Sequence, residues 1–162
     1  MARGRPVKHV REVADIYADS MTQPAEPRIP CVGGIVRDAD ARLLLVKRGQ
    51  EPAKGRWSVP GGRVQADESH TDATAREVLE ETGVRVRVGR LVGTVERDAP
   101  GGGVYLIRDY LCEVYVGSGS DAADAVQAGD DADDAAWFTP DEVRALDTSP
   151  GLVEALTEWG VL

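Results

Sequence analysis

The sequence predicts an α/β protein in which a mixed β-sheet carries helices on its faces. Three observations support this fold class: two groups of strand-like segments, a strongly marked helix between them, and helical segments at the C-terminal end. The 162 residues suffice for one domain with a single core. Apolar residues make up 42% of the chain and charged residues 29%, and no apolar run approaches the length of a membrane span. These values are typical of a globular protein and exclude a transmembrane one.

The first 28 residues differ from the rest of the chain. They begin with several basic residues, have helical character over 7–17, and end in a polar stretch with two prolines. We expect an N-terminal arm over 1–28, partly disordered, followed by a domain over 29–162. The sequence leaves open whether the arm contacts a partner in a homodimer. No apolar stretch follows the basic start, as a signal peptide would require, and we expect a cytoplasmic protein.

Regular alternation of apolar and polar residues predicts the first half of the sheet. Residues 31–37 and 42–47 are rich in β-branched residues and leucine, and the Asp-Ala-Asp between them has the composition of a turn. These two segments predict a hairpin. Residues 51–62 follow as a loop rich in glycine and proline, and we expect the ring of Trp57 to anchor this loop on the domain.

The clearest helix of the chain is expected over residues 70–82, and both of its ends are marked. Ser69 is a suitable N-cap, and Gly83 lies where a residue in the left-handed conformation ends a helix. One face of the helix is apolar and is expected to pack on the sheet. That face consists of Ala75, Val78, Leu79 and Thr82.

Three glutamates form a charged cluster on the other face of this helix. Glu77, Glu80 and Glu81 are three and four residues apart, and Arg76 is the one basic residue in the helix that offsets them. Such a cluster is either a solvated surface or a site for Mg²⁺, Mn²⁺ or Ca²⁺, which prefer carboxylate oxygens. The Pro60-Gly61-Gly62 turn before the helix favours the metal site, because glycine lets the backbone approach a ligand closely.

The rest of the chain predicts three strands and two helices. Strands are indicated by alternation with period two, and the helices by their apolar spacing and a proline in the first turn. In chain order they are strands over 84–95, 104–115 and 135–138, and helices over 140–146 and 152–159. A glycine-rich segment, 97–103, links the first two strands, and an aspartate-rich segment, 117–134, precedes the third.

The segment from Gly62 to Val84 reads Gly-x5-Glu-x7-Arg-Glu-Val-x-Glu-Glu-x-Gly-Val, and it resembles the signature of the Nudix hydrolases at every defined position. The signature covers 23 of the 162 residues. The resemblance implies an α/β/α sandwich with a mixed sheet, in which the helix at 70–82 is central to catalysis. It also implies a pyrophosphatase that uses a divalent metal ion to hydrolyse a diphosphate linkage.

The resemblance also implies the metal ligands. Glu77, Glu80 and Glu81 match the glutamates that bind the metal, usually Mg²⁺ with Mn²⁺ as an alternative, and Gly62 matches a glycine whose carbonyl often joins them. These three glutamates are therefore the expected catalytic residues.

Further roles follow from the same resemblance, with alternatives. Glu68 and Arg76 match a pair that orients the helix and the metal ligands, although they could form only a cap and a salt bridge. The final proton would be taken by Glu77 or by an acidic residue of a later loop, where Asp131 is the counterpart and Asp130 the alternative. The aspartate-rich segment could also be a plain solvated surface.

Three residues outside the signature are expected to contact substrate. Arg48 and Arg56 lie shortly before the glycine turn in the sequence and could hold the diphosphate. Tyr105 could stack on a base. Each could equally be an ordinary surface or sheet residue. The formal net charge of −9 argues against duplex nucleic acid as a partner.

The signature does not choose among nucleotide substrates. Pro100 lies sixteen residues beyond Val84, where family members that cleave ADP-ribose often have a proline, although a proline is also common in such a turn. The leading expectation is hydrolysis of a nucleoside diphosphate sugar such as ADP-ribose, giving a nucleoside monophosphate and a sugar phosphate. The alternatives are a pyrophosphohydrolase of nucleoside triphosphates, including oxidised ones, and a module that binds a nucleotide without cleaving it.

Overall fold

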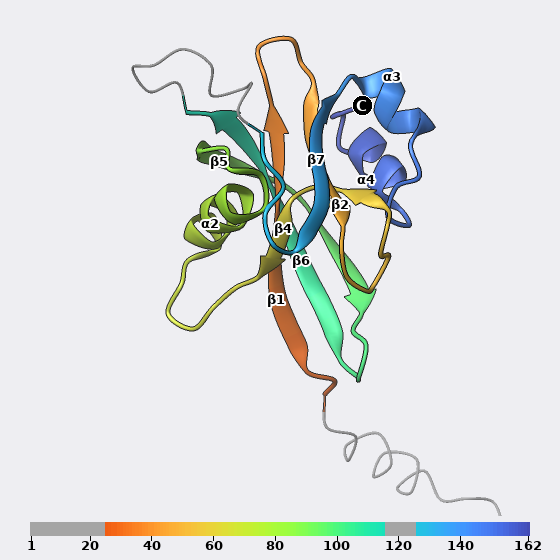
Figure 1. Cartoon of the computed structure of the whole chain (residues 1–162). Helices are drawn as coiled ribbons and strands as arrows, with labels where there is room; N and C mark the ends of the chain where they lie inside the picture. Colours follow the sequence, from red (N-terminus) through yellow and green to blue (C-terminus); the bar gives the residue numbers. More distant parts are fainter. Residues whose placement is uncertain (1–24, 116–125) are drawn as a thin grey trace, which may run out of the picture.

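The computed structural model describes residues 25–115 and 126–162, and it confirms a mixed sheet with helices on its faces (Figure 1). The expected helix at 7–17, most of the arm, and the first half of the aspartate-rich segment, 117–125, lie outside the described residues. The strands are β1 (Arg28–Arg37), β2 (Leu43–Arg48), β3 (Trp57–Ser58), β4 (Gly61–Arg63), β5 (Val86–Asp98), β6 (Val104–Val114) and β7 (Ala132–Phe138). The helices are α2 (His70–Thr82), α3 (Pro140–Ala145) and α4 (Leu152–Glu158).

Strand β1 is at the centre of the sheet. It pairs in parallel with β6 and antiparallel with β2 and β4, within a main strand order of β3-β2-β1-β6-β5. Strand β7 pairs with β2. In this register Gly33 of β1 lies opposite Gly61 of β4 on one side and opposite Asp109 of β6 on the other. Residues from three distant parts of the chain therefore form one row across the sheet.

Two apolar cores, one on each face of the sheet, hold the layers together. Successive side chains of a strand point to opposite faces, so Ile35 and Val36 of β1 belong to different cores. Val36 packs with Val78 of α2, whereas Ile35 packs with Leu156 of α4. Helix α2 thus covers one face and α3 and α4 the other, as Figure 1 shows. Within the described ranges, no helix is long and apolar enough to cross a membrane.

The central helix begins and ends as the sequence predicts. The Ser69 hydroxyl accepts a hydrogen bond from the Asp72 amide at 3.1 Å, and Gly83 has a φ of 72° in the left-handed region. The predicted packing face was partly wrong, because Leu79 is 38% exposed while Ala73 and Thr74 are fully buried. The helix is therefore turned so that its small N-terminal residues, rather than Leu79, face the sheet.

The segment at 51–62, predicted as a loop, contains strand β3 and the start of β4. Strand β4 was not predicted, because glycine has a low strand propensity. Glycine is nevertheless required there, since a Cβ at Gly61 would lie only 2.1 Å from the Val32 carbonyl oxygen. Trp57 anchors the segment as expected, with its ring edge-on to Phe138 at 4.8 Å between centroids. Strands β1, β5 and β7 each extend beyond the segments that alternation indicated.

Candidate active site

The glycine turn before α2 receives two carboxylates from that helix. The Gly61 amide donates a hydrogen bond to Glu81 Oε2 at 3.0 Å. A Cβ on Gly62 would lie 2.5 Å from the carboxylate carbon of Glu77, so only glycine leaves room for that group. The residue spacing on the helix therefore aims Glu77 and Glu81 at the backbone of one turn.

Glu81 has a perturbed pKa. Burial raises the pKa of Glu81 to about 7, although the hydrogen bond from Gly61 opposes the shift. The nearby Glu77 carboxylate adds to the increase and the Arg48 guanidinium reduces it. A buried acid with this kind of charge environment is typical of functional sites.

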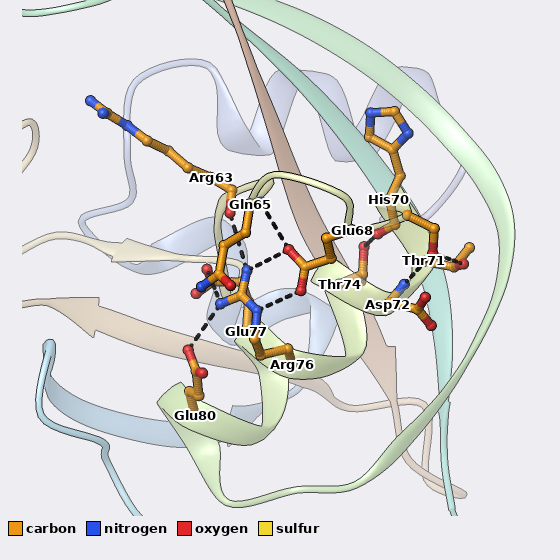
Figure 2. A network of polar contacts seen from close by, with 11 residues as sticks. Arg63, Gln65, Glu68, His70, Thr71, Asp72, Thr74, Arg76, Glu77 and Glu80 are labelled. Carbon is orange, nitrogen blue, oxygen red and sulfur yellow. Dashed lines mark hydrogen bonds and ion pairs between the residues drawn. The ribbon is translucent and has the colours of Figure 1, made fainter.

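Arg76 connects the other acidic residues of the signature, as Figure 2 shows. Its guanidinium donates to both oxygens of Glu68 at 2.7 and 2.9 Å, to Glu77 Oε1 at 2.8 Å and to Glu80 Oε2 at 3.1 Å. It also donates to the Arg63 carbonyl at 3.1 Å. The hydrogen bond from Arg76 lowers the pKa of Glu68 to about 2. The expected pairing of Glu68 with Arg76 is therefore present.

The three glutamates differ in their surroundings. The side chain of Glu77 is 14% exposed and that of Glu80 is 57% exposed. Across residues 25–115 and 126–162, no three His, Cys, Asp or Glu side chains are gathered as a ready metal site. The donors nevertheless fit a hard divalent cation, because carboxylate oxygens lie against a turn that glycine keeps free of side chains.

A cleft of about 850 Å³ opens beside the glycine turn, on the sheet face that carries α4. Gly61 and Gly62 line one part of it, and Leu156 and Trp159 line another. All three residues expected to contact substrate also line this cleft: Arg48, Arg56 and Tyr105. Pro100 is exposed in the β5–β6 turn and is not among the lining residues that the structure describes.

The cleft residues have neighbours within the protein. Arg48 Nε donates to the Pro52 carbonyl at 2.6 Å, and Arg56 forms a 3.6 Å ion pair with Asp147. Arg63 Nη2 donates to the Tyr105 hydroxyl at 2.9 Å, and the guanidinium lies 5.4 Å from the centre of the tyrosine ring. Arg48, Arg56 and Arg63 therefore line the cleft, and each also has a partner within the protein.

The acidic residue proposed from the later loop lies close to this region. Asp131 accepts a hydrogen bond from the Gln50 side chain at 3.1 Å, and its charge contributes to raising the pKa of Glu81. The Asp131 carbonyl also accepts from the Gly49 amide at 3.3 Å. Asp130 beside it is exposed.

The polar residues that line the cleft and that the sequence reasoning did not assign to the site include Arg63, Arg97 and Asp109. Arg63 had a usable signal, because it directly follows the glycine turn. Asp109 also had one, because it is an acid within the otherwise largely apolar strand segment 104–112. Arg97 had none, since only the pairing of β5 with β6 brings it to this face.

The chain is similar in sequence to known proteins. The family model described as the NUDIX domain matches residues 27–159. A MutT-like protein of Streptomyces ambofaciens is 35% identical over a segment covering 76% of this chain and 75% of that protein. An ADP-ribose pyrophosphatase of Methanocaldococcus jannaschii is 34% identical over 66% of this chain, a match that spans only 59% of that relative.

The fold also resembles that of solved structures. The MutT protein from Methanosarcina mazei Go1 superposes with a TM-score of 0.70, covering 85% of this chain and 96% of that one. The sequence identity is 22%, so this likeness concerns the fold. It agrees with an α/β/α sandwich.

Proposed function

Since this chain belongs to the NUDIX domain family and is a pyrophosphohydrolase, we propose that it hydrolyses the diphosphate linkage of a nucleotide sugar such as ADP-ribose. The observation that carries the proposal is the meeting of two α2 carboxylates at the glycine turn, beside a cleft lined by arginines. The products would be a nucleoside monophosphate and a sugar phosphate.

Glu77, Glu80 and Glu81, with the Gly62 carbonyl, are the groups proposed to hold the metal, Mg²⁺ or Mn²⁺. Hydrolases of this family generally require such a divalent metal. When bound, it would withdraw charge from the phosphate oxygens and lower the pKa of a bound water. Arg76 already holds Glu77 and Glu80 in place, so its role is to orient these ligands. Glu68 in turn holds Arg76 through both of its oxygens.

The remaining groups would position the substrate and accept a proton. Arg48 and Arg56 line the cleft and carry the positive charge that a diphosphate needs. Tyr105 offers an aromatic face in the same cleft. As water attacks one phosphorus and the bridging P–O bond breaks, a proton must leave that water. Glu77 and Asp131 are the proposed acceptors, and Asp130 is the alternative to Asp131.

ADP-ribose is the leading substrate on two grounds. One matched relative is named an ADP-ribose pyrophosphatase. The sequence also has Pro100 at the distance from the signature that ADP-ribose-cleaving members often show. Pro100 lies outside the cleft lining, so the relative's name is the stronger of the two grounds.

The test is product analysis by chromatography. The protein would be incubated in the presence of Mg²⁺ with one substrate at a time. The substrates are ADP-ribose, other nucleotide sugars, and ordinary and oxidised nucleoside triphosphates. Monophosphate plus sugar phosphate supports the proposal. Formation of monophosphate and pyrophosphate would instead indicate a pyrophosphohydrolase of nucleoside triphosphates. The absence of product from every nucleotide would favour a module that binds a nucleotide without cleaving it.

Variants connect that activity to the site. Glu80→Gln and Glu81→Gln should each abolish most turnover, because each removes a negative ligand oxygen. Glu113→Gln is the matched control, since Glu113 is an exposed glutamate on β6 paired with Arg87. Unchanged turnover in both site variants would remove these glutamates from the mechanism.

A further inference from the structure

The lining of the cleft includes a buried carboxylate that the reaction described above does not use. Asp109 is only 5% exposed, and it lines the cleft. Its Oδ1 atom has no hydrogen-bond partner in the part of the chain that the structure describes. Burying such a group without a partner is costly, and Asp109 Oδ1 is therefore a candidate acceptor for a group from outside the folded chain.

Gly33 makes the room for this carboxylate. The two residues are opposite each other on the parallel strands β1 and β6, so their side chains would point to the same face. A Cβ on Gly33 would lie 2.0 Å from Asp109 Oδ1 and 3.1 Å from Val59 Cγ2. The carboxylate therefore leans across β1 into space that any other residue at position 33 would fill.

The positive charge of Arg97 acts on Asp109 without forming an ion pair with it. Arg97 lowers the pKa of Asp109, but burial outweighs this effect and raises that pKa to about 6. The Arg97 guanidinium instead donates to the Pro150 carbonyl at 3.1 Å. Asp109 therefore keeps acceptor capacity for a ligand.

The surroundings of Asp109 suit a flat ring. Val59, Val95, Ile107 and Trp159 also line the cleft. These apolar side chains suit a nucleobase better than a sugar, because a sugar carries hydroxyl groups around its whole ring.

The position of Asp109 relative to the glycine turn also suits a nucleotide. Gly61, Gly33 and Asp109 are in one row on adjacent strands. The Asp109 backbone is two strand spacings of about 4.8 Å from Gly61, but its carboxylate lies over Gly33 and is therefore about one spacing from Gly61. Glu77 and Glu81 reach the same turn from α2. A substrate whose phosphates are held at these glutamates can thus extend past the turn and bring its base to Asp109.

We propose that Asp109 accepts a hydrogen bond from the exocyclic amine of the substrate's nucleobase and thereby selects amine-bearing bases. The proposal rests on the proposed nucleotide hydrolysis and specifies which nucleotides are taken. An ionised carboxylate only accepts hydrogen bonds. It favours the amine of adenine or cytosine over the carbonyl that hypoxanthine or uracil presents at the same place, where two oxygens would face each other.

The experiment compares matched substrates on three variants. ADP-ribose is paired with inosine diphosphate ribose, and CDP-glucose with UDP-glucose. Hydrogen bonds to a charged group contribute about 1.5–3 kcal/mol, so the unmodified protein should prefer the amine-bearing member of at least one pair by roughly 10- to 150-fold in kcat/KM. Asp109→Leu should erase this preference through KM with little change in kcat. Asp109→Asn should weaken or reverse it, because its amide can donate to a carbonyl.

Glu113→Gln is the control, since it removes an exposed carboxylate from the same strand, and it should keep the preference. Thermal unfolding checks the fold, and neither Asp109 variant should unfold at a lower temperature, because each removes a buried charge. An unchanged preference in both Asp109 variants would overturn the proposal, as would an unmodified protein without any preference.

Failure of the proposed function would give a different result. In that case the unmodified protein would form no product from any nucleotide. In that event calorimetric Kd values for the same pairs test Asp109 directly. Loss of the amine preference in Asp109→Leu then supports the assignment, and equal Kd ratios overturn it.

Discussion

Replacing Asp109 with asparagine should stabilise the protein increasingly as the pH rises. Burial holds the pKa of Asp109 at about 6 in the folded protein, against an ordinary value of 3.8. The folded state therefore binds a proton that the unfolded state has already released between these two values. The cost of the buried charge is absent below about pH 4, grows between about pH 4 and 6, and is complete above that range. Asparagine never ionises and escapes this cost.

The size of the effect follows from the two pKa values. A difference of one in pKa corresponds to about 1.4 kcal/mol, so a shift from 3.8 to about 6 costs the folded protein about 3 kcal/mol at pH 7. At pH 5 the same relation leaves about half of that cost. Other acids titrate in this range, including Glu81, whose pKa is about 7. They are common to both proteins and cancel in the comparison.

The assay is urea unfolding of both proteins at pH 5, 6, 7 and 8 in the same salt, followed by tryptophan fluorescence. We expect the difference in unfolding free energy between variant and unmodified protein to grow by about 1–2 kcal/mol from pH 5 to pH 7, then to level off. A constant difference across the series would show that Asp109 does not carry a perturbed charge. A difference that shrinks with rising pH would show that the carboxylate has a stabilising partner.

Three further predictions concern the glycine turn, the arginine network and a helix cap. Gly62→Ala should lower kcat/KM roughly 100-fold in steady-state assays while unfolding near the usual temperature, because its methyl group displaces the Glu77 carboxylate. Arg76→Lys should raise the Mg²⁺ concentration for half-maximal activity about 10- to 100-fold in a metal titration. The reason is that the single ammonium group of lysine cannot replace the several guanidinium N–H groups that hold Glu68, Glu77 and Glu80. Thr139→Ala should cost about 1 kcal/mol in urea unfolding with activity retained, because it removes the capping box with Glu142 that begins α3.

Features set by neighbouring residues could be predicted from the sequence. The helix at 70–82, its Ser69 cap and its Gly83 end all appear in the structure, because caps and helical spacing depend on a few consecutive residues. The pairing of Glu68 with Arg76 was implied by the family resemblance and is present in the structure. Both belong to the continuous signature segment.

Features set by close approach of distant strands could not be predicted in this way. Strand β4 was missed because its glycines have low strand propensity, and their use is visible only where Val32 passes beside Gly61. The orientation of α2 was partly misjudged because Leu79 is apolar, yet the sheet receives Ala73 and Thr74 instead. In both cases packing outweighed the local signal.

The sequence by itself determined the chemistry available to this protein: carboxylates spaced on one helix, a glycine turn before it, and strands and helices in a recognisable order. These properties are local, because helical and strand periodicity place nearby side chains without reference to the rest of the chain. Only the tertiary structure decided which groups are buried and with whom. Glu81 became a perturbed acid because folding buries it against the glycine turn, and Asp109 became an unpaired carboxylate because parallel pairing of β1 with β6 sets it against Gly33. Desolvation and contact depend on every neighbour in space, and strand pairing brings those neighbours from distant parts of the chain.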